Sequence, residues 1–368
     1  MIDLFLKQLS NGDIQWLKQN GHTENIQTGG VLIEQARSPD FLYLIISGEF
    51  MGSISQNQGG RLGRVFAALE DDQDLEQEIA RFSPGEVMGT VSTVELTPAK
   101  MTIRATENSS LLAIPHPLLQ QQITQDLGFA SRFYRGIATL LSERFGRLVQ
   151  YFLRQHKKQI PPLEDVPLIF GELRDSDVDW MLNVGRLTQI SAQEVLILNG
   201  EQMENLYILL QGTIAVLVKE EQPNKLISLF AALERDEQTD ESLATEIIRL
   251  NRGEILGEAI ALNDPMSNYT LRALENCSLL TIPGQHLLVK LQQDVGIAAR
   301  FYRVVSMLIS GRLQGLISRL GYGRSPYQVG QTLDTQATYE DEIDLEIMDN
   351  LTLGGARFDW MLKRLKVS

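Results

Sequence analysis

An internal repeat is the feature that most constrains the fold of this chain. The segment LYLIISGEF at 42–50 corresponds to LYILLQGTI at 206–214, and RVFAALE at 64–70 corresponds to SLFAALE at 228–234, both at an offset of 164 residues. Beyond these motifs the offset becomes 168, because the second copy is four residues longer, and SRFYR at 131–135 then corresponds to ARFYR at 299–303. A register maintained over this length indicates two homologous domains in tandem.

Both copies show the same order of sequence patterns. Each begins with a short helical pattern carrying Trp16 or Trp180, continues with short apolar runs of period two separated by glycines, and ends with a long apolar helical pattern at 127–155 or 295–320. This order predicts a small antiparallel sandwich or barrel between helices. We expect domains at 1–156 and 168–322, a proline-containing linker at 157–167, and an acidic tail at 323–368 that ends in a short amphipathic helix.

The segment GEILGEAIALNDPMSNYTLRA at 253–273 suggests a phosphate-binding site in the second copy. It reads as a strand, a tight Gly-Glu turn, a short helix, a polar loop and a second strand. A glycine that admits an anion close to backbone N–H groups is a sensible phosphate cradle. The segment resembles the phosphate-binding cassette of cyclic-nucleotide-binding domains, whose pattern it fits at Gly257, Glu258, Ala259, Ala261, Leu262, Pro265, Thr270, Leu271 and Ala273.

The resemblance implies a fold class and a set of site residues. The fold is mainly β with α: two tandem double-stranded β-helix (jelly-roll) domains, each flanked by helices. The candidate ligand-binding residues of the second copy are Gly257, Glu258, Ala259, Ser267, Asn268 and Thr270. The family has an arginine at the place of Ser267, and a buried phosphodiester favours such a charge-assisted partner.

The first copy departs further from the family pattern. Thr90 follows Gly89 where the family has glutamate, and Ala99 stands three residues before Thr102 where the family has arginine. We therefore expect this copy to be a structural or protein-contact module without a bound cyclic nucleotide.

Composition narrows the function classes. A net charge of −14 argues against broad binding to a nucleic-acid backbone. No apolar run is long enough for a membrane helix, and the N-terminus has no signal-peptide pattern. The single cysteine, Cys277, excludes an intrachain disulfide and a cysteine-cluster metal site. We expect a cytoplasmic protein.

No catalytic pattern is found in the sequence. The four histidines are scattered without metal-ligand spacing, and neither a P-loop nor a nucleophile elbow occurs. We predict no enzyme activity, no metal and no cofactor, apart from a possible cyclic nucleotide in the second copy.

Three further segments suggest protein contacts. Acidic insertions precede the cassette hairpin in both copies, and the residues around 76–79 and 243–247 suggest short surface helices within them. In the tail, FDWML at 358–362 echoes the start of the second copy, and Phe358, Trp360 and Met361 are candidate partner contacts. The long closing helices offer a dimer contact, either between two chains or between the two copies in one chain.

Two functions from different classes follow. The first is a non-enzymatic regulatory, adaptor or structural protein that acts through protein–protein interaction, with weak or absent nucleotide binding. The alternative is a sensor of cAMP, cGMP or another small ligand that uses only the second copy.

Overall fold

The computed structural model describes residues 4–35, 37–55, 76–90, 99, 101–154, 169–218, 244–262, 266–319 and 345–367. The chain divides into two compact units, Met1–Leu148 with Ala299–Met348 and Val149–Ala298 with Asp349–Ser368. The predicted linker, most of both acidic insertions and most of the acidic tail lie outside the described residues. The domain boundaries expected from the repeat remain predictions.

The first unit contains the first copy of the repeat up to Leu148, near the end of its closing helix. Its elements are η1 (Leu6–Gln8), α1 (Asn11–Asn20), β1 (His22–Ile26), β2 (Val31–Ile33), β3 (Phe41–Ser47), β4 (Phe50–Ser55), β5 (Glu76–Phe82), β6 (Val87–Met88), β7 (Thr102–Ala105), β8 (Ser109–Pro115), α4 (His116–Gln125) and α5 (Leu127–Arg154).

Eight strands of this unit form two four-stranded antiparallel sheets, in the orders β1-β8-β3-β6 and β2-β7-β4-β5. Strands that are distant in sequence are neighbours in both sheets, which is the connectivity of a jelly roll. Alternating side chains of the two sheets meet in one apolar core, as the period-two pattern predicted. The core cluster comprises Ile33, Tyr43, Ile45, Phe50, Phe82, Met88, Ile103, Ala105, Leu111 and Ala113.

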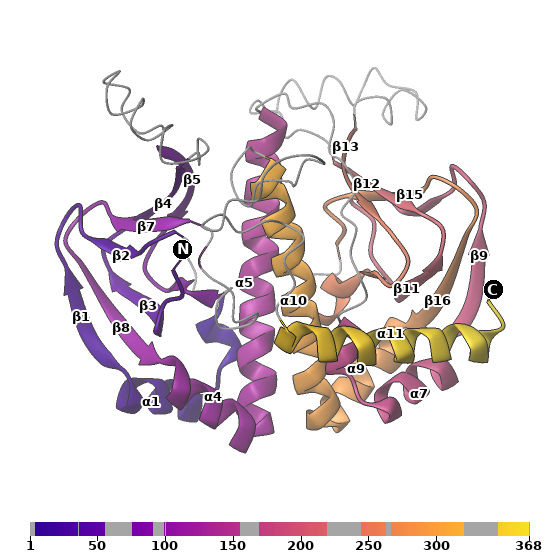
Figure 1. Ribbon diagram of the computed structural model, residues 1–368, viewed down its shortest axis with the longest axis horizontal. Coiled ribbons are helices and arrows are strands. Elements are labelled where there is room, and N and C mark those ends of the chain that lie inside the picture. The colour runs from indigo at the N-terminus through magenta and orange to yellow at the C-terminus, as the bar shows by residue number, and fades with distance from the viewer. Residues whose placement is uncertain are drawn as a thin grey trace. The chain divides into compact units, whose positions relative to one another are not determined.

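Helix α1 is held by a capping box at its N-terminus and by an ion pair with α5. The Ser10 hydroxyl accepts the backbone N–H of Asp13 and the Asp13 carboxylate accepts that of Ser10, a reciprocal capping box. The same carboxylate accepts two hydrogen bonds from the Arg132 guanidinium of α5, at 2.6 and 2.9 Å. Figure 1 shows α1 and α4 at one end of the strands β1, β8 and β3.

The second copy of the repeat has the same arrangement and is followed by the C-terminal helix, although its closing helix belongs to the first unit from Ala299 on. Its elements are α6 (Ile169–Glu172), α7 (Asp175–Val184), β9 (Arg186–Ile190), β10 (Val195–Ile197), β11 (Asn205–Gln211), β12 (Ile214–Val218), β13 (Thr245–Leu250), β14 (Ile255–Leu256), η3 (Glu258–Leu262), β15 (Thr270–Ala273), β16 (Cys277–Pro283), α9 (Gly284–Gln293), α10 (Val295–Arg319) and α11 (Leu345–Leu365). The sheets run β9-β16-β11-β14 and β10-β15-β12-β13, the same order as in the first unit. The predicted fold class is confirmed.

The expectation of surface helices at the ends of the acidic insertions is wrong. Residues 76–82 form β5 and residues 245–250 form β13, each paired antiparallel with the preceding strand of its sheet. The glutamates and alanines there favour a helix in isolation, but pairing with an open strand edge overrides that weak propensity. Phe82 shows why the strand is preferred, because it enters the core at 3% exposure.

The two closing helices meet within one chain. From Ala299 on, α10 belongs to the first unit, where it contacts α5. The Ser306 hydroxyl donates to the Tyr134 carbonyl oxygen at 3.0 Å. Arg135 lies over the Tyr302 ring at 5.7 Å, and Arg303 lies over the Tyr134 ring at 6.0 Å. Since these residues correspond at the repeat offset of 168, each helix offers its partner the same Tyr-Arg pair.

Across the part of the chain that the structure describes, every helix is too short or too polar to span a lipid bilayer.

Candidate functional site

The cassette turn of the second copy depends on a glycine. β14 ends at Leu256, Gly257 has a positive φ of 77°, and η3 begins at Glu258. A Cβ on Gly257 would stand 2.6 Å from the Asn205 carbonyl oxygen of β11, closer than packed atoms approach. Both the left-handed conformation and the close approach therefore require glycine.

The predicted site residues of this copy fall into two groups. Gly257, Glu258 and Ala259 are consecutive at the end of β14, and the Glu258 side chain is 5% exposed. Ser267, Asn268 and Thr270 lie at the start of β15, in the other sheet of the unit. Asn268 is exposed to solvent, so it is not part of an enclosed site.

The position of the family's arginine is closed in this copy. Ser267 is 2% exposed, and its hydroxyl donates to the Tyr269 carbonyl oxygen and accepts the Tyr269 N–H at 3.3 Å. The Thr270 hydroxyl accepts the Asn199 N–H at 3.1 Å. These hydrogen bonds hold the loop against the strand, and no positive charge reaches an anion from this position.

The glycine turn that opens the cassette of the first copy has the same backbone conformation and a different side chain after it. Gly89 again has a positive φ, 81°, and a Cβ there would stand 2.9 Å from the Phe41 carbonyl oxygen. Thr90 is buried after this turn. Ala99 packs against the core cluster, and the Thr102 hydroxyl accepts the Gln35 N–H at 3.2 Å, as Thr270 does in the second copy.

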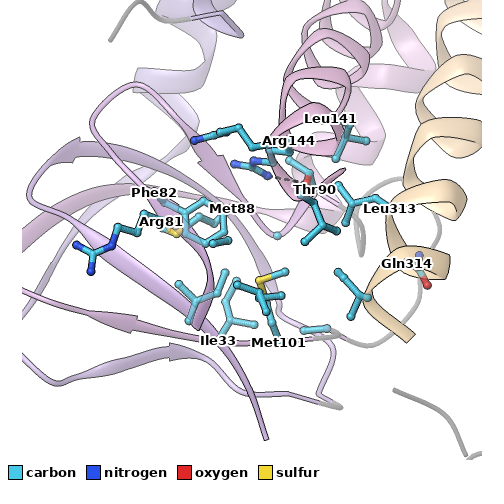
Figure 2. Close-up of a pocket in the computed structure, with 18 residues that line it drawn as sticks. Ile33, Arg81, Phe82, Met88, Thr90, Met101, Leu141, Arg144, Leu313 and Gln314 are labelled. Carbon is cyan, nitrogen blue, oxygen red and sulfur yellow. Dashed lines mark hydrogen bonds between the residues drawn. The ribbon is translucent and has the colours of Figure 1, made fainter. Parts of the chain in front are cut away.

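A cavity of about 260 Å³ adjoins this first cassette. Figure 2 shows Arg144 and Thr90 together on one side of it and Ile33 and Met101 on the other. The lining comes from the sheets, the cassette turn, α5 and α10: Ile33, Ile79, Ala80, Arg81, Phe82, Met88, Gly89, Thr90, Ala99, Met101, Ile103, Leu141, Arg144, Arg147, Leu148, Leu313, Gln314 and Ile317.

The comparison with protein families identifies both copies. The model described as "Cyclic nucleotide-binding domain" matches residues 23–126 and 187–294, which together are more than half of the chain. The chain belongs to the cyclic nucleotide-binding domain family. A comparison with curated proteins gives no significant match.

Solved structures with similarity to the tandem cyclic nucleotide-binding domains include protein kinase A regulatory proteins. The regulatory domain of Toxoplasma gondii PKA with cAMP is 13% identical over 80% of this chain and 89% of that chain, with a TM-score of 0.27. The regulatory subunit of a cAMP-independent protein kinase A from Trypanosoma brucei is 15% identical over 80% and 88%, with a TM-score of 0.28. A cyclic nucleotide-binding domain from Methylobacillus flagellatus is 17% identical over 42% and 78%, with a TM-score of 0.35.

Arg144 is a residue of the first cyclic nucleotide-binding domain that sequence reasoning missed. Its Nη2 donates to the Val87 carbonyl oxygen and its Nη1 lies 3.5 Å from the Thr90 hydroxyl. Its guanidinium lies 4.8 Å from the centroid of the Phe82 ring, a cation–π contact. Burial lowers the pKa of Arg144 to about 10, with Arg147 lowering it further and the carboxylates of Glu86 and Glu143 opposing the shift. The side chain therefore stays charged at neutral pH.

A signal for this arginine was present in the repeat. Ser142 and Arg144 of the first domain correspond to Ser310 and Arg312 of the second at the offset of 168. The apolar stripes of both closing helices dominate their sequence pattern, which does not distinguish a buried polar position from an exposed one. Arg312 is also buried, at 7% exposure.

The C-terminal helix docks on its own chain. In the second unit the Phe358 ring lies 5.4 Å from the Phe170 ring, and Arg357 donates to Asp175 at 2.7 Å and to two carbonyl oxygens of α6. Phe358 and Met361, predicted as partner contacts, are buried, whereas Trp360 is 43% exposed. Of the three residues, Trp360 alone presents a large accessible surface.

Proposed function

We propose that this chain is a non-enzymatic regulatory or adaptor protein, in which the tandem cyclic nucleotide-binding domains act through protein contacts and bind cyclic nucleotides weakly or not at all. The observation that carries the proposal is the side chain at the arginine position of each cassette. Ala99 packs on the core, and the Ser267 hydroxyl is hydrogen-bonded within its own loop.

The negatively charged phosphodiester of a cyclic nucleotide loses its hydration when it binds. In the family, charge-assisted hydrogen bonds from an arginine guanidinium offset the free-energy cost of this desolvation. Removal of a charged partner of this kind costs about 2–5 kcal/mol, so the affinity falls about thirtyfold or more. In both cassettes a neutral residue occupies that position, and in the first domain Thr90 also replaces the glutamate.

The test is calorimetric titration of the full chain with cAMP and with cGMP. We expect no saturable heat up to about 1 mM ligand, the concentration range of very weak binding. Micromolar binding of either nucleotide would contradict the proposal. Glu258→Ala in the second domain and Thr90→Ala in the first then identify the domain responsible.

One observation favours the sensor as a second candidate. The second domain keeps the Gly257-Glu258 turn, and the Glu258 carboxylate is held inside the domain at 5% exposure. A carboxylate at this turn suits a ribose hydroxyl, because the hydroxyl donates a hydrogen bond that the carboxylate oxygen accepts. The sensor predicts nucleotide binding that Glu258→Ala abolishes and Thr90→Ala leaves unchanged.

The protein-contact part of the proposal is supported by α11. Leu353 and Trp360 are both 43% exposed and lie two helical turns apart, on one face of a helix whose other face is buried. A purified partner should lose affinity for Trp360→Ser by about tenfold or more, since exposed tryptophans are frequent binding hot spots. Full affinity of both Trp360→Ser and Leu353→Ser would place the contact elsewhere.

A further inference from the structure

We propose that the cavity of the first domain binds a small apolar monocarboxylate, whose carboxylate group is held by Arg144 and whose apolar body lies against the side chains of the two sheets. The proposal does not rest on the proposed function, because it concerns a different class of ligand.

The lining is mostly apolar, and its polar members are Arg81, Thr90, Arg144, Arg147 and Gln314. Ile33 of β2, Phe82 of β5, Met88 of β6 and Met101 before β7 form the wall contributed by the sheets. In Figure 2 Ile33 and Met101 lie on the side opposite Thr90 and Arg144, whereas the Phe82 ring lies against the Arg144 guanidinium at 4.8 Å. The hydroxyl or amide groups of a polar ligand would have no hydrogen-bond partners against this wall. Each such buried group would weaken the binding free energy by about 1–3 kcal/mol. An apolar body with one polar head fits the lining.

The charge of the cavity fixes the charge of that head. Arg147, the neighbouring arginine, is paired with two carboxylates, Glu86 and Glu143, each at 2.8 Å. Arg144 has only neutral acceptors, Val87 and Thr90, and no carboxylate pairs with it in the described part of the chain. The Glu86 and Glu143 carboxylates act on Arg144 from a distance but do not hydrogen-bond to it, so its guanidinium is a cation at the cavity without a direct anionic partner among the described residues. Such a cation suits a ligand with a single negative charge.

The geometry of the guanidinium favours a carboxylate among singly charged anions. The Nε of Arg144 is buried and has no acceptor among the described residues, and the contact of Nη1 with Thr90 is at the 3.5 Å limit of a hydrogen bond. A planar carboxylate accepts two N–H groups from one edge of a guanidinium, and the Nε–H of Arg144 is a donor on such an edge that the described residues leave without an acceptor.

The same features disfavour a cyclic nucleotide at this position. The cassette supplies Thr90 and Ala99 in place of an acceptor for the ribose and a cation for the phosphate. The cavity volume of about 260 Å³ is also below the range of about 300–1,000 Å³ for sites of drug-sized ligands. The expected ligand is therefore smaller than a drug-sized molecule and much less polar than a nucleotide.

The experiment compares octanoate with its neutral isostere octanamide, using the full chain and calorimetric titration. We expect octanoate to bind about tenfold or more tightly than octanamide, because only the carboxylate forms charge-assisted hydrogen bonds. In Arg144→Gln the octanoate affinity should fall by the same factor while the octanamide affinity stays within about threefold. Met101→Trp, which fills the apolar end, should abolish both.

The controls separate a lost site from a lost fold. Arg144→Lys keeps the charge without the planar fork, and we expect it to retain part of the preference for octanoate. The far-ultraviolet circular dichroism and melting temperature of each variant report its folding. Equal binding of octanoate and octanamide, unchanged octanoate binding in Met101→Trp, or no binding up to about 10 mM would overturn the proposal. Displacement of octanoate by cAMP would overturn the assigned ligand class.

Discussion

Replacement of Arg144 by methionine should change the free energy of unfolding of the first unit by less than about 2 kcal/mol, although it removes a buried hydrogen-bonded side chain. One pKa unit corresponds to about 1.4 kcal/mol, so burial that lowers the pKa of Arg144 to about 10 destabilises the charged folded state by on the order of 3 kcal/mol. Methionine removes this cost and keeps an apolar stem of similar length.

The losses on the other side are of similar size. The hydrogen bond that the charged guanidinium donates to Val87 contributes about 1.5–3 kcal/mol, and the long contact with Thr90 about 0.5 kcal/mol. The cation–π contact with Phe82 contributes about 0.5–1 kcal/mol. These contributions add to about 2.5–4.5 kcal/mol and largely cancel the gain. Arg144 therefore adds little to stability, which is consistent with its proposed role in ligand binding.

Urea unfolding followed by Trp16 fluorescence measures this change. The chain has three tryptophans, and replacement of Trp180 and Trp360 by phenylalanine leaves Trp16 as the probe of the first unit. Leu141→Ala, one turn earlier on α5 and 1% exposed, is the control and should lose about 2–5 kcal/mol. A loss of about 3 kcal/mol or more in Arg144→Met would refute the reasoning, since the charge would then be a net source of stability.

Three further perturbations test other parts of the structure. Burial raises the pKa of the Asp13 carboxyl, but hydrogen bonds from Arg132 and Ser10 lower it by more, so its stabilising contribution should be complete above about pH 4 and be lost as the pH falls through the lowered value. Asp13→Asn should cost about 1–3 kcal/mol at pH 7 and flatten the acid dependence of urea unfolding, and a variant with unchanged dependence would contradict this. Gly257→Ala should cost the second unit about 1–3 kcal/mol, because its φ is positive and its Cβ would meet a carbonyl oxygen; a cost below about 0.5 kcal/mol would show that the turn relaxes. Phe358→Ala should release α11, seen as faster amide hydrogen exchange across Leu345–Leu365, and unchanged exchange would mean that the remaining contacts, those of Arg357 and Met361 among them, hold the helix.

The sequence predicted the architecture because its strongest signals are of long range. The repeat offset, the glycine punctuation and the period-two runs all describe two jelly rolls with closing helices, and α5 and α10 begin at the expected Leu127 and Val295. Local composition failed at residues 76–82, where strand pairing decided the conformation. The pattern alone also could not show that the Ser267 hydroxyl bonds within its own loop or that Arg144 lines a cavity, because both depend on tertiary packing.

The pairing of α5 with α10 has a consequence for how this chain can change over time. In an assembly of two identical chains every substitution at the contact is imposed twice, so each position must suit its own copy. Here Ser306 meets the backbone at Tyr134, while the corresponding position of the first copy is Ala138. Each half of the contact can therefore vary separately, and the cassettes with Thr90 and Glu258 are equally free to specialise for different tasks. One polypeptide thereby encodes two unequal domains of the same family in a fixed one-to-one ratio.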